Sequence, residues 1–345
     1  MTYKVLIFRR GSLGDVVISL PALSVLAERF PDSERRILTN SPVAGRAAPL
    51  HDLLAGSGLV CGYFVFPPSN WNPVEVRKLR SEIRAWRPDI LVYLSEPSRR
   101  LRLIREMMFF RWCGVRRFIG LPFSSALRAY HKIGEDLWES EGNRLLRAIN
   151  AESHIVPQAD LGLGPKEIAQ ADKILSDWRG AVRFIVFCIG GKGEDKDWGD
   201  HNWELVLKTL APDHPDLGIA AIGSNEEHGR SEALLQLWCG PSINLCGDLP
   251  SRISAIVAGR ASFYLGHDSG PMHLAALAGV PCIAVFSARA KPGVWFPTGN
   301  DHRIFYPWEL TSKIPATAGL RSGGGSIHSI EPETVLVACR ELFSS

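Results

Sequence analysis

Residues 3–15 read Tyr-Lys-Val-Leu-Ile-Phe-Arg-Arg-Gly-Ser-Leu-Gly-Asp, and this stretch decides the fold. Its first part, Tyr3–Phe8, is a short apolar run that predicts a strand. Gly11 and Gly14 permit a tight turn, and apolar residues then recur at helical spacing over Asp15–Phe30. Asp15 is placed as the predicted N-cap of this helix. A strand, a glycine turn and a helix are therefore expected in immediate succession.

The same alternation of strand-like runs and helical stretches continues along the first half of the chain. The predicted strands are Arg36–Thr39, Gly62–Phe66, Asp89–Leu94 and Arg117–Leu121, and Val74–Trp86 is a predicted helix between them. Strands that alternate with helices are typical of a parallel sheet covered by helices.

A second α/β domain is predicted beyond a linker. The chain has 345 residues, more than one core usually supports. Residues 151–165 have weak periodicity and contain Pro and Gly, so we interpret them as the linker. The alternation then restarts, with strands at Val182–Phe187, Leu217–Ile222, Ser262–Leu265 and Pro281–Phe286 and helices at Asn202–Leu210, Glu226–Trp238, Arg252–Ala258 and Pro271–Ala278.

These elements predict an α/β fold of two Rossmann-like domains, covering residues 1–160 and 161–330. Ligands of such sheets bind beyond the carboxyl ends of the strands, so a cleft between the domains is the expected site. The final segment, 331–345, is a predicted helix that could pack back on the N-terminal domain.

Composition is that of a globular protein, with 46% hydrophobic residues, 22% charged residues and a net charge of +3. Residues 1–160 hold 23 Lys or Arg against 16 Asp or Glu, whereas the remainder holds 16 against 20. This asymmetry indicates either an anionic partner for the first half or uneven decoration of a solvated surface. Seven cysteines without a CxxC pair and the lack of an 18-residue apolar run predict a cytoplasmic protein.

Three motifs could carry chemistry. Asp15 on the glycine turn is either a helix cap or a general base facing the cleft. Residues 266–273 read Gly-His-Asp-Ser-Gly-Pro-Met-His, and Ser269 and Gly270 would open a helix whose tip could hold a pyrophosphate. His273 could donate to a phosphate oxygen. The alternative for this motif is plain capping by Asp268 or Ser269, with His273 as a satisfied polar residue.

The third motif lies at residues 187–193, Phe-Cys-Ile-Gly-Gly-Lys-Gly, and is followed by Lys196-Asp-Trp. Glycines with a nearby lysine after a strand suit a phosphate-binding loop. It is not a Walker loop, because GxxxxGK[ST] is absent. The alternative is a solvated glycine loop.

Together these motifs resemble glycosyltransferase family 9, the ADP-heptose:lipopolysaccharide heptosyltransferase family, over nearly the whole chain. The matching residues are Gly14-Asp15 with Leu20-Pro-Ala-Leu downstream, Lys196-Asp-Trp, and the segment from Asp268 to His273. The resemblance implies a GT-B type fold and an inverting transfer that requires no metal or other cofactor. It implies a nucleotide-sugar donor, ADP-linked, on the C-terminal domain. The implied acceptor, a lipopolysaccharide core or other envelope glycan, binds the N-terminal domain.

The resemblance also implies roles for single residues. Asp15 matches the catalytic carboxylate, with Ser12 and Gly14 beside it on the acceptor side. Lys196 matches a lysine on the donor phosphate, and Asp268 an acidic residue on the donor sugar. The other donor-side matches are Gly191, Lys192, Glu227 at the ribose, Leu249 at the base, Ser269, Gly270 and His273. Glu227 could instead be a first-turn carboxylate that stabilises its helix.

A basic stretch, residues 98–132, interleaves nine Arg or Lys residues with Met, Phe and Trp. It could bind an anionic glycolipid acceptor, with Arg99 and Arg102 as candidate contacts, or lie on the inner face of the inner membrane. The alternative is a core helix with a solvated arginine face. No nucleic-acid-binding motif is present.

Two other functions remain open at this point. A sugar-nucleotide epimerase or hydrolase could share the fold, and a non-catalytic protein could bind the same donor. No metal site is predicted, because the ten histidines are scattered and form no HxxxH pair.

Overall fold

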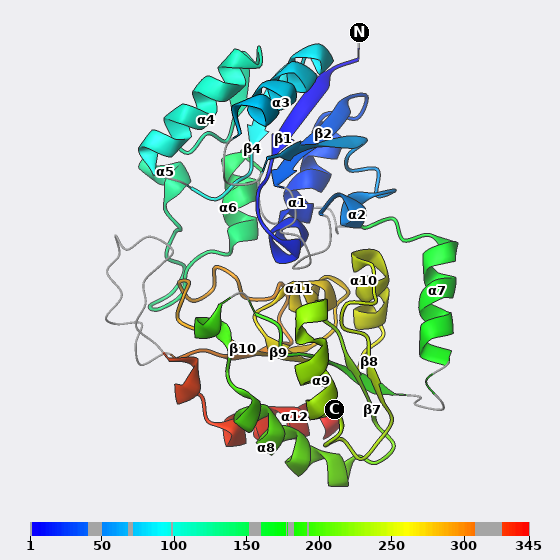
Figure 1. Cartoon of the computed structure of the whole chain (residues 1–345). Coiled ribbons are helices and arrows are strands. Elements are labelled where there is room, and N and C mark those ends of the chain that lie inside the picture. Colours follow the sequence, from blue (N-terminus) through cyan, green and yellow to red (C-terminus); the bar gives the residue numbers. More distant parts are fainter. Residues whose placement is uncertain are drawn as a thin grey trace. The chain divides into compact units, whose positions relative to one another are not determined.

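The computed structural model describes residues 2–40, 50–67, 72–97, 99–151, 160–176, 178, 183–191, 193–307 and 326–344. The chain divides into two compact units. The first comprises residues 1–131 and 139–163, and the second residues 132–138 and 164–345. Each unit contains one sheet with helices on both of its faces (Figure 1).

The first unit is built on a parallel five-stranded sheet in the order β3-β2-β1-β4-β5. Its strands are β1 (Lys4–Phe8), β2 (Glu34–Asn40), β3 (Gly62–Phe66), β4 (Ile90–Tyr93) and β5 (Arg117–Ile119). The central strand, β1, is flanked by β2 and β4, with Phe8 in register with Tyr93. The order therefore reverses between β1 and β4, which is the topological switch point of the sheet.

The helices of the first unit cover both faces of this sheet. They are α1 (Leu13–Arg29), α2 (Leu50–Leu54), α3 (Pro73–Trp86), α4 (Arg100–Trp112), α5 (Ser125–Arg128) and α6 (Glu141–Ala148). Because side chains alternate along a strand, Leu6 and Phe8 of β1 share one face, and they belong to a core cluster with Leu79 and Ile83 of α3 and Phe110 of α4. Figure 1 shows α1 and α6 on the opposite side of the sheet.

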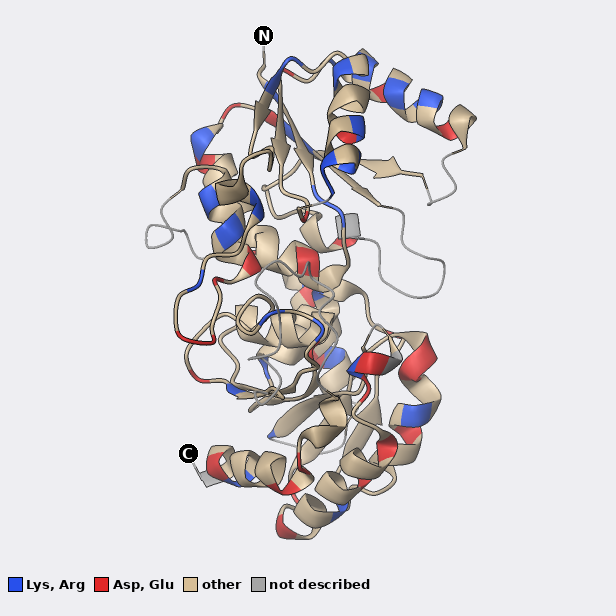
Figure 2. Cartoon of the chain, turned by 90° about the vertical axis from the view of Figure 1, so that its left-hand side faces the viewer, with Lys and Arg blue, Asp and Glu red and all other residues tan. Residues whose placement is uncertain are grey.

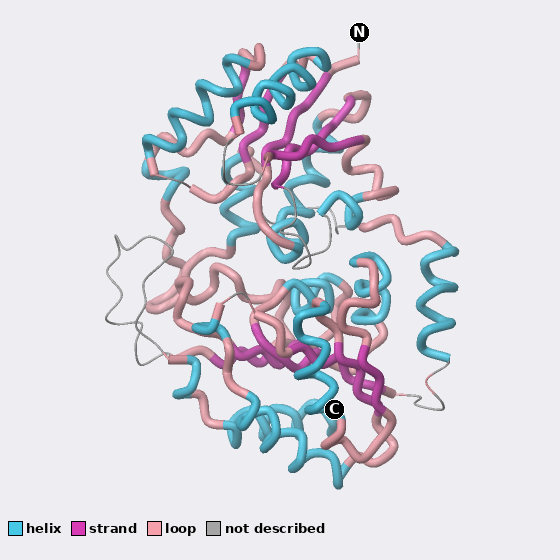
Figure 3. The backbone as a smooth tube through the Cα atoms, viewed as in Figure 1, coloured by secondary structure: helices cyan, strands magenta, loops and turns pink. Residues whose placement is uncertain are grey.

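The second unit has a parallel six-stranded sheet in the order β11-β10-β9-β6-β7-β8. Its strands, magenta in Figure 3, are β6 (Phe184–Cys188), β7 (Gly218–Ala221), β8 (Ser242–Asn244), β9 (Tyr264–His267), β10 (Cys282–Val285) and β11 (Arg303–Phe305). Strand β6, the first of the second unit along the chain, lies in the middle of its sheet, as β1 does in the first unit. Its neighbours are β7 and β9, so the switch point lies between β6 and β9.

The helices of the second unit also form two layers. They are α7 (Pro165–Ser176), α8 (Asp200–Leu210), α9 (His228–Leu235), α10 (Ser251–Gly259), α11 (Gly270–Leu277) and α12 (Pro332–Ser344). One core cluster joins Phe187 of β6 with Trp203 of α8, Leu234 of α9 and Leu336 of α12. The buried residues of the C-terminal helix thus belong to the core of the second unit. Helices α7, α10 and α11 pack together in the other layer.

The predicted α/β fold of two parallel sheets is confirmed. Strands β8 and β11 were not predicted, because their three residues show no apolar period, whereas the equally short β5 was predicted as part of the longer run Arg117–Leu121. For residues 98–132 the sequence left open an acceptor- or membrane-binding stretch or a core helix with a solvated arginine face, and the structure gives α4 one buried and one exposed side. The predicted linker, 151–165, falls largely on residues outside the described ranges.

Candidate active site

Each sheet places two loops at its switch point, where the chain leaves neighbouring strands toward opposite faces. In the first unit these loops follow β1 and β4, and we call residues 9–15 and 94–96 the first-unit site. In the second unit they follow β6 and β9, and we call residues 189–198 and 267–273 the second-unit site. Three of the predicted motifs lie in these two sites.

Asp15 does not occupy the N-cap position that the sequence predicted. Helix α1 begins at Leu13, so Ser12 is the N-cap and Asp15 is the third helical residue. The Asp15 Oδ2 atom accepts hydrogen bonds from Ser12 N at 2.6 Å and Ser12 Oγ at 2.9 Å, a capping box. The prediction failed because spacing locates a helix start only to within a few residues. One carboxylate oxygen, Oδ2, is therefore committed to the cap.

The turn before Asp15 requires glycine at position 11. Gly11 has a φ of +144°, and a Cβ there would lie 2.1 Å from the Asp15 carboxyl carbon. Its amide donates to Asn40 Oδ1 at 2.8 Å, which ties the turn to the end of β2. The backbone therefore approaches the Asp15 carboxylate as closely as only a glycine allows. The carboxylate retains partial access to solvent, with 15% of its side chain exposed.

A buried charge network supports the first-unit site. Arg9, which is fully buried, donates to Glu141 Oε1 at 2.8 Å and to the Leu94 carbonyl at 2.7 Å, and its Nη2 lies 3.4 Å from Asp15 Oδ1. Arg144 holds Glu141 from the other side at 2.6 Å. Burial alone would raise the pKa of Glu141, but Arg144 and Arg9 lower it to about 2. Glu141 is therefore ionised and neutralises much of the two arginines' charge.

Glu96 is the remaining carboxylate of the first-unit site. It follows Ser95, whose hydroxyl accepts from Arg10 N and whose carbonyl accepts from Arg144. Burial, followed by the negative charges of Asp15 and Glu141, raises the pKa of Glu96 to about 7. Among the described residues, no hydrogen bond or ion pair reaches its carboxylate. It is thus a half-buried acid whose pKa is raised by burial and by its neighbouring carboxylates.

The second-unit site brings together three predicted residues from two loops. Lys196 Nζ forms an ion pair with Asp268 Oδ2, and His273 Nε2 lies 3.9 Å from Asp268 Oδ1. Lys196 and Asp268 keep 20% and 12% of their side chains exposed, so both can be reached by a ligand. His273 is almost fully buried on α11. A cation and an acid at this switch point suit a phosphate and a hydroxyl respectively.

His267, which the sequence analysis missed, fixes the loop that carries Lys196. It is fully buried, and burial lowers its pKa to about 4, so the ring is neutral. Its Nε2 accepts from Trp198 N at 3.0 Å and from Trp203 Nε1 at 3.3 Å. Nδ1 therefore carries the proton and donates to the Ile189 carbonyl at 2.8 Å. One imidazole thereby ties β9 to the loop after β6.

Small residues keep the second-unit site open. A Cβ at Gly191 would lie 3.2 Å from Lys196 Cβ, and one at Gly190 would lie 3.1 Å from the Glu227 carboxylate. Glu227 is therefore next to the loop after β6, and its contact with the ribose stays a prediction. It is the third residue of a 3₁₀ turn, Asn225–Glu227, and accepts from Ser224 in a capping box. These hydrogen bonds fit the alternative of a carboxylate in the first turn of a helix, while the position of Glu227 is beside the site.

The other predicted donor residues differ in how well the structure places them. Ser269 is the N-cap of α11, with no capping bond from its side chain, and its hydroxyl lies 2.9 Å from the Tyr264 hydroxyl. Gly270 is the first residue of α11. Leu249 is half-buried between β8 and α10. Lys192 lies outside the described residues.

The two predicted acceptor-side arginines lie at the start of α4. Arg99 is its N-cap residue and is exposed. Arg102 is half exposed and donates from Nε to Glu106 Oε1 at 3.1 Å. Glu106 is itself buried and accepts from Tyr93 and Arg10. Arg102 is thus partly committed within its own helix. Gly14 is buried in the first turn of α1.

The described ranges contain neither a metal-holding group nor a membrane-spanning helix. No group of three His, Cys, Asp or Glu side chains there is arranged to hold a metal ion. No helix in the same ranges has both the length and the apolarity needed to cross a bilayer.

Sequence comparison relates the chain to sugar transferases. The family model of glycosyltransferase family 9 (heptosyltransferase) matches residues 148–313. Lipopolysaccharide heptosyltransferase 2 of Salmonella typhimurium is 24% identical over 196 residues, covering 54% of this chain and 54% of that protein. Lipopolysaccharide heptosyltransferase 1 of Pseudomonas aeruginosa is 23% identical over 319 residues, covering 84% of this chain and 80% of that protein. The chain thus spans about half the length of the first relative.

Structural comparison shows the same fold over the whole chain. A family-9 glycosyl transferase from Veillonella parvula has a TM-score of 0.74 at 16% identity, covering 99% of this chain and 98% of that one. The E. coli ADP-heptose lps heptosyltransferase II has a TM-score of 0.69 at 19% identity, with the same coverage. E. coli heptosyltransferase WaaC with ADP has a TM-score of 0.64 at 17% identity, covering 98% and 99%. The predicted GT-B type fold is therefore confirmed.

Proposed function

Because the family model of glycosyltransferase family 9 matches residues 148–313, we propose that this chain is a member of that family and transfers a heptose or related sugar from an ADP-linked donor to an envelope acceptor. A lipopolysaccharide core is the favoured acceptor, and the cytoplasm is the favoured location. The observation that carries the proposal is the chemistry at the two switch points. One presents an ionisable carboxylate on a glycine turn, and the other a lysine–aspartate pair between glycine loops.

In the proposed reaction, the second unit holds the donor. Lys196 neutralises a phosphate and stabilises the diphosphate as it leaves, which is electrostatic catalysis. Asp268 accepts hydrogen bonds from the donor sugar, and the tip of α11 at Ser269 and Gly270 offers free backbone N–H groups to the pyrophosphate. Gly191 permits close approach of the donor, and Glu227 and Leu249 contact the ribose and base. His273 and the undescribed Lys192 complete the proposed contacts.

The first unit supplies the base in this proposal. Asp15 takes the proton of the acceptor hydroxyl while the hydroxyl oxygen attacks the anomeric carbon of the donor sugar. In this proposal the configuration at that carbon inverts, and no metal is required. The Oδ1 atom of Asp15 is the oxygen free of the capping box, since Oδ2 accepts from Ser12. Ser12 and Gly14 flank this carboxylate on the acceptor side.

The proposal is tested by incubating the purified chain with ADP-heptose, with and without a lipopolysaccharide core acceptor. A transferase forms heptosylated acceptor and releases ADP in step with it. Conversion of the donor at the same rate without acceptor would indicate the epimerase or hydrolase alternative. Donor binding without turnover on any acceptor pool would indicate a binding protein.

A membrane-borne acceptor is favoured by the surface of α4. Four apolar side chains with spacings of three, four and four residues lie on one exposed side of this helix, and we call them the α4 stripe: Leu101, Ile104, Met108 and Trp112. Leu101 is 82% exposed and Met108 is 63% exposed. The opposite side of α4 is buried in the core of the unit through Leu103 and Phe110. The helix therefore presents apolar residues to solvent that its own unit does not cover.

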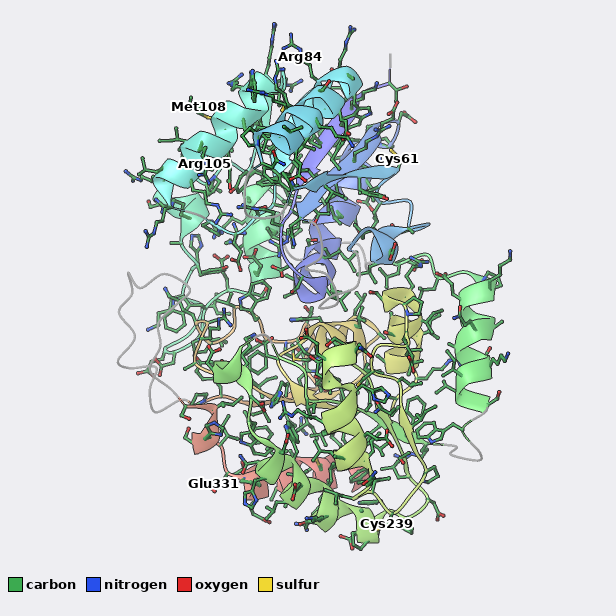
Figure 4. All side chains as sticks on the ribbon, in the orientation of Figure 1. Cys61, Arg84, Arg105, Met108, Cys239 and Glu331 are labelled. Atoms are coloured by element: carbon green, nitrogen blue, oxygen red, sulfur yellow. The ribbon has the colours of Figure 1, made fainter. Side chains whose placement is uncertain are left out.

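Positive charge surrounds this stripe. Exposed arginines of α4 and its N-cap are Arg99, Arg100, Arg102, Arg105 and Arg111. Figure 4 labels Met108 and Arg105 on this helix, and Figure 2 shows blue segments outnumbering red ones on the helices of the first unit. Apolar residues flanked by arginines are typical of helices that lie in the interface of an anionic bilayer.

The α4 stripe is tested with vesicles of phosphatidylcholine with and without phosphatidylglycerol. The unchanged chain is expected to sediment with the anionic vesicles, and added salt should weaken binding by screening. Changing Leu101 and Met108 together to Glu should reduce the bound fraction about tenfold. Val337→Glu, an equally drastic change at a half-exposed site on α12, serves as the control. Equal vesicle binding by both variants would contradict a membrane contact through α4.

A further inference from the structure

Glu96 and Asp15 lie together because of the sheet order. Asp15 belongs to the loop after β1 and Glu96 to the loop after β4, and these strands are neighbours at the switch point. Ser95 fixes the second loop, since its hydroxyl bonds Phe8 O and Arg10 N. After burial, the charge of Asp15 is the next cause that raises the pKa of Glu96. The architecture thus places two carboxylates at the one place in the unit where a ligand is expected.

The buried cations around these two carboxylates are already engaged. Arg144 binds Glu141 through two nitrogens, and Arg9 binds Glu141 and the Leu94 carbonyl. The Asp15 carboxylate has a 3.4 Å contact with Arg9 Nη2 in addition to its capping bonds, and the Asp15 carbonyl accepts from Arg9 Nε at 3.1 Å. A charge on Glu96 would be the third negative charge against two buried arginines. Like charges at short range oppose one another, so the proton of this cluster resides on Glu96.

From this arrangement we infer that Glu96 is a positioning residue that sets how readily Asp15 takes the acceptor's proton, an inference that rests on the proposed function. When Glu96 is neutral, Asp15 carries the charge of the pair alone. When Glu96 is ionised, its repulsion favours a proton on Asp15. In the transfer step the acceptor O–H bond breaks, an O–H bond forms on Asp15, and no bond of Glu96 changes.

The protonation of Glu96 depends on the charged groups that face it. Asp15 comes from α1, Arg9 from the end of β1, and Glu141 and Arg144 from α6. Tyr130 lies against Glu141, to which its hydroxyl donates at 2.9 Å, and burial raises its pKa well above the usual value, so it stays neutral. Near neutral pH, Glu96 is the group of this set that titrates, because its pKa is raised to about 7 and that of Glu141 is lowered to about 2.

The test compares the pH dependence of kcat in the unchanged chain, Glu96→Gln, Glu96→Asp and Glu82→Gln, an exposed acid on α3. The unchanged chain should gain about threefold in kcat between pH 6 and pH 8 as Glu96 ionises, the size of effect that Brønsted behaviour gives for a stronger base. Glu96→Gln should stay flat at the lower rate. Glu96→Asp and Glu82→Gln should both retain the rise. A rise that survives in Glu96→Gln, or a flat profile in the unchanged chain, overturns the inference.

Thermal unfolding separates this inference from the proposed function, because it needs no substrate. The folded pKa of Glu96 is raised above its unfolded value, so its contribution to stability is fully present below about pH 4.5 and is lost as pH rises through about 7. Glu96→Gln should therefore match the unchanged chain in Tm near pH 5 and exceed it at pH 8. An equal difference at both pH values contradicts the inference. A chain that passes this test without transferring sugar refutes only the proposed function.

Discussion

The two switch-point sites of this chain share a topology and differ in how their charges are arranged. In the first unit Arg9, Glu141 and Arg144 form a buried network beneath Asp15. In the second-unit site Lys196 and Asp268 form a partly exposed pair among glycines, and the loop that carries Lys196 forms two further exposed pairs, Asp197 with Arg230 and Asp195 with Arg289. In the proposed function, the first arrangement sets where a proton resides, and the second presents a partly exposed lysine to an anionic ligand. One fold thus supplies two kinds of chemistry through its loops.

The largest effect expected from this comparison is on stability. Glu141→Gln removes the charge that holds two buried arginines, and breaking a buried pair by removing one partner costs about 3–5 kcal/mol. The matched change in the second unit is Glu167→Gln, which breaks the pair between Glu167 and Arg252 at a more exposed position. It should cost about 1 kcal/mol or less.

Urea unfolding of both variants measures this contrast. If Glu141→Gln is no more destabilising than Glu167→Gln, the first-unit network does not hold its site together. The position of Asp15 would then need another explanation.

The next effect concerns turnover. Asp15→Asn removes the proposed base, so kcat should fall at least about a hundredfold. The amide oxygen can accept both bonds from Ser12, but the negative charge at the N-terminus of α1 is lost, and we expect a cost of about 1 kcal/mol or less. Turnover and unfolding measured on the same preparation distinguish the two roles. A variant that loses stability but keeps its turnover would leave Asp15 as a cap alone.

The fold could be predicted from sequence because its signals are local. The apolar runs of β1, β4 and β6 and the helical spacing after them are visible without any tertiary information. The start of α1 was misplaced by three residues, because both Ser12 and Asp15 are good cap residues. Edge strands β8 and β11 were missed because neither lies in a longer apolar run, as the equally short β5 does.

The candidate site could be predicted only where a motif marked it. The motif residues Asp15, Lys196 and Asp268 lie in turns that the sequence marks with glycines. The residues without a motif, Arg9, Glu96 and His267, act through partners far away in the chain. His267 bonds Ile189 and Trp198, which are 78 and 69 positions distant. No periodicity or spacing reports such contacts. The one available signal was their position directly after a predicted strand, at the edge where ligands bind.

The smallest expected effect is on the affinity for the donor nucleotide, and it concerns the second unit. Lys196→Ala removes a cation from the second-unit site, and the loss of a charged hydrogen bond should weaken ADP binding by about tenfold or more. Lys208→Ala, which removes an exposed lysine paired with Glu204 on α8, should leave ADP binding unchanged. Equal affinities for both variants would exclude Lys196 from the donor contacts.

The central claim, that proton transfer belongs to the first unit and donor binding to the second, is tested most directly by calorimetric titration of ADP into Asp15→Asn and Lys196→Ala. Asp15→Asn should bind ADP as the unchanged chain does while its turnover falls at least about a hundredfold. Lys196→Ala should bind ADP about tenfold more weakly. If Asp15→Asn loses ADP affinity while Lys196→Ala keeps it, the assignment of the two units is contradicted.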